Sequence, residues 1–438
     1  MNSDRPILKD TGQSARVAWA ELGTAVLSLA LFLNVLRTGA VIVPDSIGYL
    51  DHWIIRPPLL PWLLDFSRVL LGPRYLLGAA AIQTVLLLAS VHFLCRELRR
   101  TFSLGGLGYC GCYISLVFVM VPNPMLGVVG AQIASEAIAY SLFLVNIALL
   151  LPCLQERHPR RAAAALMVAA VNILSREQMF YAFFTTALFL VFLQRRQRGT
   201  ALKTLLLATL CLACVSLANG AYHKAVNGSF SGPSWLYPHL WASLIFVCRH
   251  EDVALYAGDP EYPAIQGIFR YAEDNRLFAH HRRADNSSMS RHYMYKMPSI
   301  FFGGIVNAYK KQADQPMDSE LFKRVSAASR RHFPVLLAKK LPQFAELFAI
   351  KLLQCLGVLD GFLAACFLVA WRAAPRSPIA LALGLALAML LANCLLLGLC
   401  NQIAPRYLIT TTALTLVGCV LSASHLSRLR VHNEAMEL

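Results

Sequence analysis

Long apolar runs recur along the 438-residue chain and constrain its fold more than any other feature. A helix that crosses a bilayer needs about 20 mostly apolar residues. Only 15% of the residues are charged, whereas soluble domains carry about 25%. The pattern therefore predicts an all-α polytopic membrane protein with about ten transmembrane helices, at residues 20–43, 75–95, 103–121, 136–154, 162–174, 178–193, 204–221, 352–371, 378–398 and 407–425.

The distribution of basic residues predicts the orientation of these spans. The chain has a net charge of +16, and with ten spans its arginine and lysine clusters all fall on one side. The positive-inside rule makes that side cytosolic, together with both termini. The basic clusters on either side of residues 162–193 share one side only if this segment forms a short hairpin, with its tip at 175–178 near the outer face. No nucleic-acid motif accompanies the charge, so its expected partners are membrane lipids.

The same topology divides the chain into three parts. Residues 1–221 form an N-terminal membrane module whose first outer loop covers 44–74. Residues 222–351 form a large extracytoplasmic region, which we expect to be mostly helical and to end in an amphipathic helix lying on the membrane. Residues 352–438 supply the C-terminal membrane helices and a cytosolic tail. The Ala/Leu/Arg-rich composition suggests the inner membrane of a bacterium.

Four charged residues from separate parts of the sequence are predicted to meet at the outer face: Asp45, Glu136, Arg176 and Arg406. Charges near apolar spans are costly unless they meet water, a partner or a substrate. Structural alternatives exist for each of them. Asp45 could cap a helix, Glu136 could begin one, Arg176 could neutralise a neighbouring acid, and Arg406 could be an interfacial anchor. Asp360, inside the eighth predicted span, is either a structural hydrogen-bonding group or a proton site.

Short motifs in a fixed order accompany these charges. They are Pro44-Asp45-Ser46-x-x-Tyr49, Arg56-Pro57-Pro58, Ser135-Glu136, Arg176, Pro334 and Arg406-Tyr407. In this order they resemble the GT-C superfamily of integral-membrane glycosyltransferases, in particular bacterial members similar to protein mannosyltransferases and aminoarabinose lipid A transferases. The resemblance implies a polyprenyl-phosphate-linked sugar as donor and an outer-loop aspartate at the active centre. Many relatives follow that aspartate with a second acid, whereas Ser46 stands here. No metal ligand is therefore assigned, although a divalent cation stays open as a cofactor.

These observations predict the role of each residue. Asp45 is the candidate general base for an acceptor hydroxyl. Arg406, with Arg56 or Arg176, is expected to bind the donor phosphate through charge-assisted hydrogen bonds. The substrate-binding candidates are Arg56, Tyr49, Glu136, Arg176, Arg406 and Tyr407, the tyrosines shaping the pocket and Glu136 orienting an arginine or the acceptor.

Two other functions account for parts of the sequence. A transporter or lipid flippase would explain many spans with buried charges, although we find no repeat of the kind that transporters show. An O-antigen polymerase or ligase would also carry a large outer loop, and His280-His281-Arg282-Arg283 keeps that reading open. A glycosyltransferase acting on a glycan, lipid or protein acceptor is the function that the motifs favour.

Overall fold

The fold is described from a computed structural model that covers residues 11–120, 129–156, 158–230, 236–283, 287–313, 319–400 and 405–437. In these residues the regular structure is helical, apart from one isolated parallel bridge between Val41 and Gln132. The predicted all-α class is therefore confirmed.

Each of the ten predicted spans coincides with a helix. The helices are α1 (Thr11–Thr38), α4 (Tyr75–Phe102), α5 (Gly106–Phe118), α6 (Glu136–Leu150), α7 (Pro159–Ile173), α8 (Phe180–Gln194), α9 (Arg198–Asn227), α15 (Val358–Ala373), α16 (Pro378–Cys400) and α17 (Pro405–Glu437). Their buried faces form one large hydrophobic core. The protein is thus a multi-pass membrane protein.

Not all ten helices have the length of a complete span. Seven segments of the described chain are long and apolar enough to cross a membrane, and an eighth is counted if α14 and α15 form one bent span. The remaining predicted spans are short, because α5 has 13 residues and α7 has 15. The short α7 agrees with the prediction of a hairpin that does not reach across the full bilayer.

A second set of helices builds its own core. It consists of α10 (Leu236–Val247), α11 (Tyr262–Asp274), α12 (Met289–Pro298), α13 (Asn307–Ala313) and α14 (Ser319–Cys355), with 3₁₀-helices η5 (His250–Tyr256) and η6 (Ala279–Arg283) and the π-helix η7 (Ser299–Val306). We call it the α10–α14 module. Its buried residues run from Leu240 to Leu347 and form a cluster separate from that of the membrane helices. This segment was expected to be mostly helical, and it is.

Helix α14 connects the module with the membrane helices. It passes through Pro334 and Pro342, has a kink at Lys340, and meets α15 at an angle of 78°. The amphipathic helix that we expected near the end of this region, over residues 333–342, is thus the middle of a longer helix. Near its end, Cys355 packs with Leu390 and Cys394 of α16, so the module is joined to the bundle by apolar contacts.

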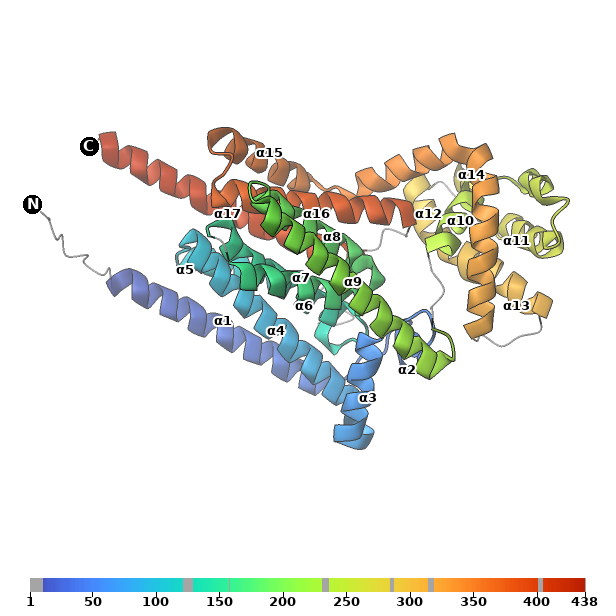
Figure 1. Cartoon of the computed structure of the whole chain (residues 1–438), viewed down its shortest axis with the longest axis horizontal. Helices are drawn as coiled ribbons and strands as arrows, with labels where there is room; N and C mark the ends of the chain where they lie inside the picture. Colours follow the sequence, from blue (N-terminus) through green and yellow to red (C-terminus); the bar gives the residue numbers. More distant parts are fainter. Residues whose placement is uncertain are drawn as a thin grey trace, which may run out of the picture.

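The module lies at one end of the membrane helices (Figure 1). Helix α1 begins and α17 ends at the opposite end, whereas the short α2 (Ser46–Leu50) lies at the end nearest the module. Helix α2 and α3 (Leu59–Leu71) are both part of the first loop, and η1 (Gly72–Arg74) leads from α3 into α4. The described 3₁₀-helices η2 (Val129–Ala131), η3 (Leu151–Leu154) and η4 (Glu177–Met179) flank α6 and α8.

Asp360 lies beside the break between α14 and α15 rather than inside a continuous helix, contrary to our expectation. It is in the first turn of α15, where its carboxylate accepts hydrogen bonds from the Gly357 backbone at 2.7 Å and from the Thr415 hydroxyl at 2.7 Å. An acid is favourable at this position because it accepts from an amide that no helical carbonyl reaches. These two hydrogen bonds favour the structural role for Asp360.

Candidate active site

Asp45 and Arg56 form an ion pair in the first loop. Arg56 Nη2 lies 2.9 Å from Asp45 Oδ1, and the two side chains are 21% and 27% exposed. Asp45 precedes α2 as its N-terminal flanking residue, but its side chain makes no capping hydrogen bond. The helix-cap alternative for Asp45 is therefore wrong, and its carboxylate is committed to Arg56 while still reachable from solvent.

The end of α2 explains how Arg56 returns to Asp45. The amide of Trp53 donates to the Gly48 carbonyl at 2.9 Å, and that of His52 donates to the Tyr49 carbonyl at 3.4 Å. This is the bonding pattern of a Schellman motif, in which the residue after the helix cap is left-handed. His52 takes that place with φ 52°. The chain thereby reverses, and the rigid Pro57-Pro58 pair then leads into α3.

Gly48 leaves room for the Arg56 side chain. A Cβ atom at Gly48 would lie 2.7 Å from Arg56 Nε and 3.2 Å from the Trp53 ring, closer than such atoms ordinarily approach. The Arg56 guanidinium also lies 4.8 Å from the Tyr49 ring centre, at cation–π distance. Arg56 is therefore held between the backbone of α2, the Tyr49 ring and the Asp45 carboxylate.

Replacing Gly48 with Ala tests this packing. Because Nε is part of the guanidinium, the added methyl should displace that group and loosen its contact with Asp45. We expect sugar transfer to fall by about tenfold, since small misplacements of an active-site group have costs of this order or larger. Gly267→Ala is the matched control, because nothing lies within 4 Å of the position of its added Cβ. Equal transfer rates for the two variants would contradict the assignment.

Tyr49 joins this ion pair to a second charged pair. Its buried hydroxyl donates to Ser135 Oγ at 2.8 Å, directly beside Glu136. Burial raises the pKa of Tyr49, and among its charged neighbours Arg56 and Arg176 act in the opposite direction while Glu136 adds to the rise. The phenol therefore stays protonated at neutral pH and keeps its role as donor. It lies within electrostatic reach of three of the predicted site residues.

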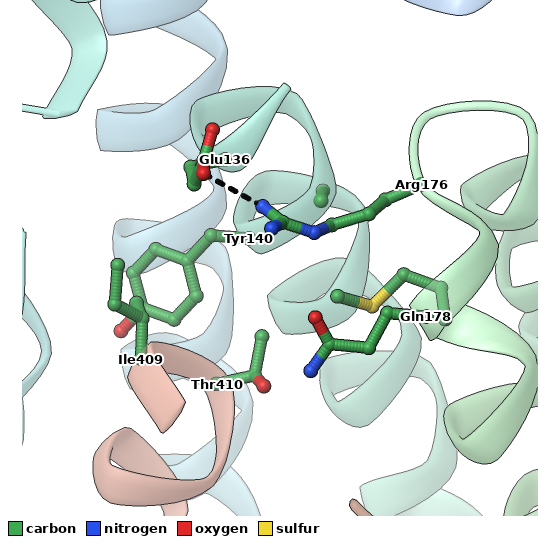
Figure 2. A pocket seen from close by; sticks show the side chains of 8 residues that line it. Glu136, Tyr140, Arg176, Gln178, Ile409 and Thr410 are labelled. Atoms are coloured by element: carbon green, nitrogen blue, oxygen red, sulfur yellow. Dashed lines mark ion pairs between the residues drawn. The ribbon is translucent and has the colours of Figure 1, made fainter. Parts of the chain in front are cut away.

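Glu136 and Arg176 form that second pair. Arg176 Nη1 lies 2.8 Å from Glu136 Oε1, with the two side chains 14% and 8% exposed. Arg176 comes from the tip between α7 and α8 and extends toward the first turn of α6, where Glu136 begins the helix (Figure 2). Both residues line a small pocket with Tyr140, Gln178 and Thr410. Because Glu136 is the more buried acid, it is placed to hold Arg176 rather than to reach a soluble partner.

Backbone contacts hold the three segments together. The Val41 amide donates to Ala131 at 2.8 Å, and the Ile133 amide donates to Val41 at 3.0 Å. The Leu59 amide donates to Leu174 at 3.0 Å, which ties the first loop to the hairpin tip. These bonds bring Asp45, Glu136 and Arg176 to one end of the bundle, as the topology predicted.

Several residues that position the site were not predicted. The buried Ser46 hydroxyl donates to Ile133 at 2.7 Å and accepts from the Val43 amide at 2.9 Å, so the residue after Asp45 fastens the loop. Gln178 donates to Asn393 of α16 at 2.7 Å, and the hydroxyls of Tyr181 and Thr410 are 2.6 Å apart. The available signal was an isolated polar residue within an apolar run, as at Asn393.

The contacts of two predicted substrate-binding residues cannot be described. Arg406 and Tyr407 are in the first turn of α17, but their side chains lie outside the described part of the structure. Ile409 and Thr410, further along the same first turns of α17, line the pocket beside Arg176.

A metal at Asp45 receives no support from the surrounding residues. Ser46 has its hydroxyl engaged with the backbone, and Arg56 already supplies a positive charge to the carboxylate. In the described residues, the groups of three side chains suited to a metal are Glu273 with His280 and His281, and Asp259 with Glu261 and His332. Both groups belong to the α10–α14 module.

The fold and this site define a class of protein, a polytopic membrane protein with acids and arginines gathered at one end of its helices. Residues 55–218, well under half of the chain, match the sequence family of dolichyl-phosphate-mannose-protein mannosyltransferases. This region includes Arg56, Glu136 and Arg176, whereas Asp45 and Arg406 lie outside it. The match confirms the resemblance drawn from the motifs for this part of the chain.

Two solved structures show a distant likeness to this chain. They are ArnT from Cupriavidus metallidurans bound to undecaprenyl phosphate, at 14% identity and TM-score 0.37, and the same protein in the apo state, at 15% and 0.33. The alignments cover 94% of this chain and 78% or 77% of ArnT. A search of curated proteins found no match.

Proposed function

We propose that this protein transfers a sugar from a polyprenyl-phosphate-linked donor to an extracytoplasmic acceptor that is a glycan, a lipid or a protein. The observation that carries the proposal is the ion pair of Asp45 and Arg56 at the loop end of the membrane helices, joined through Tyr49 to the pair of Glu136 and Arg176. The family match of residues 55–218 supports the chemistry. One structure of ArnT has undecaprenyl phosphate bound, which is a lipid of the class proposed here.

Asp45 is the acid best placed to act as general base. It is 27% exposed, whereas Glu136 is 8% exposed and paired with Arg176. In the proposed step, Asp45 accepts the proton of the acceptor hydroxyl while the oxygen of that hydroxyl bonds to the anomeric carbon of the donor sugar. The bond from that carbon to the lipid phosphate breaks, and the phosphate leaves with the electron pair. Arg56 holds the carboxylate in position for this transfer.

The arginines suit the leaving phosphate. Charge accumulates on the phosphate oxygens as the bond breaks, and guanidinium groups fixed in advance stabilise that charge. We assign this role to Arg406, together with the charge of Arg56 or Arg176. Tyr49 and Tyr407 would shape the pocket. Glu136 is assigned the role of orienting an arginine, and its ion pair with Arg176 suits that role.

The basic clusters support an orientation with this site outside. Arg99 lies near the end of α4, Arg160 at the start of α7, and Arg196 between α8 and α9. From the positive-inside rule we infer that these clusters and both termini are cytosolic, and that Asp45 faces the outside of a bacterial inner membrane. A lipid-linked donor suits this location because its phosphate remains at the bilayer edge.

The decisive experiment offers purified protein in liposomes a set of polyprenyl-phosphate sugars that differ in the sugar: a hexose, a pentofuranose and an amino sugar. We expect one of them to be cleaved, with release of the lipid phosphate that increases when an acceptor is added. Movement of the intact donor across the bilayer without bond cleavage would instead favour the flippase.

A further inference from the structure

A side-chain cluster in the α10–α14 module has the chemistry of a transition-metal site. It consists of Glu273 near the end of α11, and His280 and His281 in η6. One ligand atom from each residue lies within 4.8 Å of the others. His281 Nε2 is 3.3 Å from Glu273 Oε1, and the two imidazole rings are 4.1 Å apart.

The local fold places these three residues side by side. Helix α11 ends in a second Schellman motif, with Leu277 donating to Ala272 at 2.8 Å and Arg276 left-handed at φ 53°. The chain then turns back, and the buried Leu277 and Phe278 anchor it in the core of the module. As a result η6 begins beside the last turn of α11, with Phe278 stacked on the His280 ring.

The surroundings of the His280 and His281 rings suit coordination of a metal ion. His281 Nδ1 is buried and has no hydrogen-bond partner within the described structure. His280 is exposed, so an ion could enter from solvent. The ring of His280 interacts with the backbone of Cys248, a contact of the kind that orients a ligating histidine. Arg249 is the nearby opposing charge, while the side chain of Arg282 is directed to Met289 Sδ at 2.7 Å.

The other candidate group is chemically different. Glu261 Oε2 already accepts from Tyr309 at 2.8 Å and lies 2.6 Å from Arg331 Nη2 and 2.9 Å from His332 Nε2. Arg331 also lies 3.7 Å from Asp259. A cation would have to displace this guanidinium, so the Asp259 group is a satisfied ion-pair network.

We propose that Glu273, His280 and His281 bind Zn²⁺ or another late first-row divalent cation. Two imidazoles and one carboxylate suit such ions, whereas Mg²⁺ and Ca²⁺ require oxygen ligands. Zn–N bonds of about 2.0–2.1 Å place tetrahedral ligand atoms roughly 3.3 Å apart, so only small side-chain rotations are needed. The ion would fasten η6 to α11 and leave a fourth position for water or a soluble ligand. This site is independent of the proposed sugar transfer.

The test measures binding of Zn²⁺ and Co²⁺ to full-length protein that carries no polyhistidine tag and has been stripped with chelator. We expect one tightly bound ion per chain, with the visible absorption of tetrahedral Co²⁺. His280→Ala and Glu273→Gln should each weaken binding at least tenfold, as loss of a ligand does at least as much as loss of its support. His158→Ala is the control, because His158 lies 3.7 Å from Glu156 in an isolated pair.

The isosteric Glu273→Gln variant keeps the test valid if His280→Ala does not fold. Binding of a full equivalent with unchanged affinity in Glu273→Gln would overturn the proposal. So would a wild-type protein that binds no more Co²⁺ than its His280→Ala variant. Because the readout is binding, neither outcome depends on whether the protein transfers sugar.

Discussion

Replacing Asp45 with Asn is expected to lower sugar transfer by about 10²–10⁴-fold, the usual contribution of a general base. The amide has the shape of the carboxylate and can still accept from Arg56 at the same position, which lies 2.9 Å away in the wild type. It cannot take a proton from the acceptor hydroxyl. Donor binding should therefore change much less than turnover, and steady-state transfer with a separate donor-binding measurement will distinguish the two.

Asp51→Asn is the matched control for this variant. Asp51 is an exposed acid at the other end of α2, where its backbone takes part in ending the helix. Its replacement should leave transfer near the wild-type rate. Full turnover by a folded Asp45→Asn protein would remove Asp45 from the mechanism.

Breaking the ion pair of Glu136 and Arg176 should have the largest effect on stability. Both partners are mostly buried and lie 2.8 Å apart. Removing one partner of a buried pair leaves the other charge without compensation, which costs about 3–5 kcal/mol. Arg176→Gln and Glu136→Gln should each lower the free energy of unfolding by about this amount, as measured by denaturant unfolding in detergent micelles. The double variant should recover part of the loss, because no charge is left alone.

Arg68→Gln provides the surface comparison. Arg68 lies 3.3 Å from Asp65, and both side chains are close to half exposed. Exposed pairs contribute about 0–1 kcal/mol, so this variant should unfold almost like the wild type. If Arg176→Gln also unfolded almost like the wild type, the ion pair of Glu136 and Arg176 would not stabilise the folded protein as we expect.

The sequence determined much of the fold because membrane solvation leaves few choices for backbone hydrogen bonds. An apolar run of sufficient length must be helical in a bilayer, and all ten predicted spans are helices. Span lengths were less certain. Helix α14 ends at Cys355 and α15 begins only at Val358, so Asp360 is a helix-start residue.

Some residues of the candidate site could also be predicted from the sequence. Acids and arginines next to apolar runs are costly, so Asp45, Glu136 and Arg176 were noticeable, and topology grouped them. Arg406 and Tyr407 remain predictions from the motifs. The sequence indicated only that Ser46 stands where many relatives have a second acid. The structure shows that its hydroxyl donates to the carbonyl of Ile133.

The partners within the site were decided by tertiary structure alone. Sequence patterns could not say that Arg56 pairs with Asp45 and Arg176 with Glu136, because the alternative pairings are equally favourable in charge. The choice depends on contacts between segments far apart in the chain, such as Val41 with Ala131 and Leu59 with Leu174. The sequence by itself thus determined the helical membrane fold and the charges available at its outer end. Packing determined which acid is left accessible, since Glu136 is enclosed where α6 begins while Asp45 remains on the exposed loop.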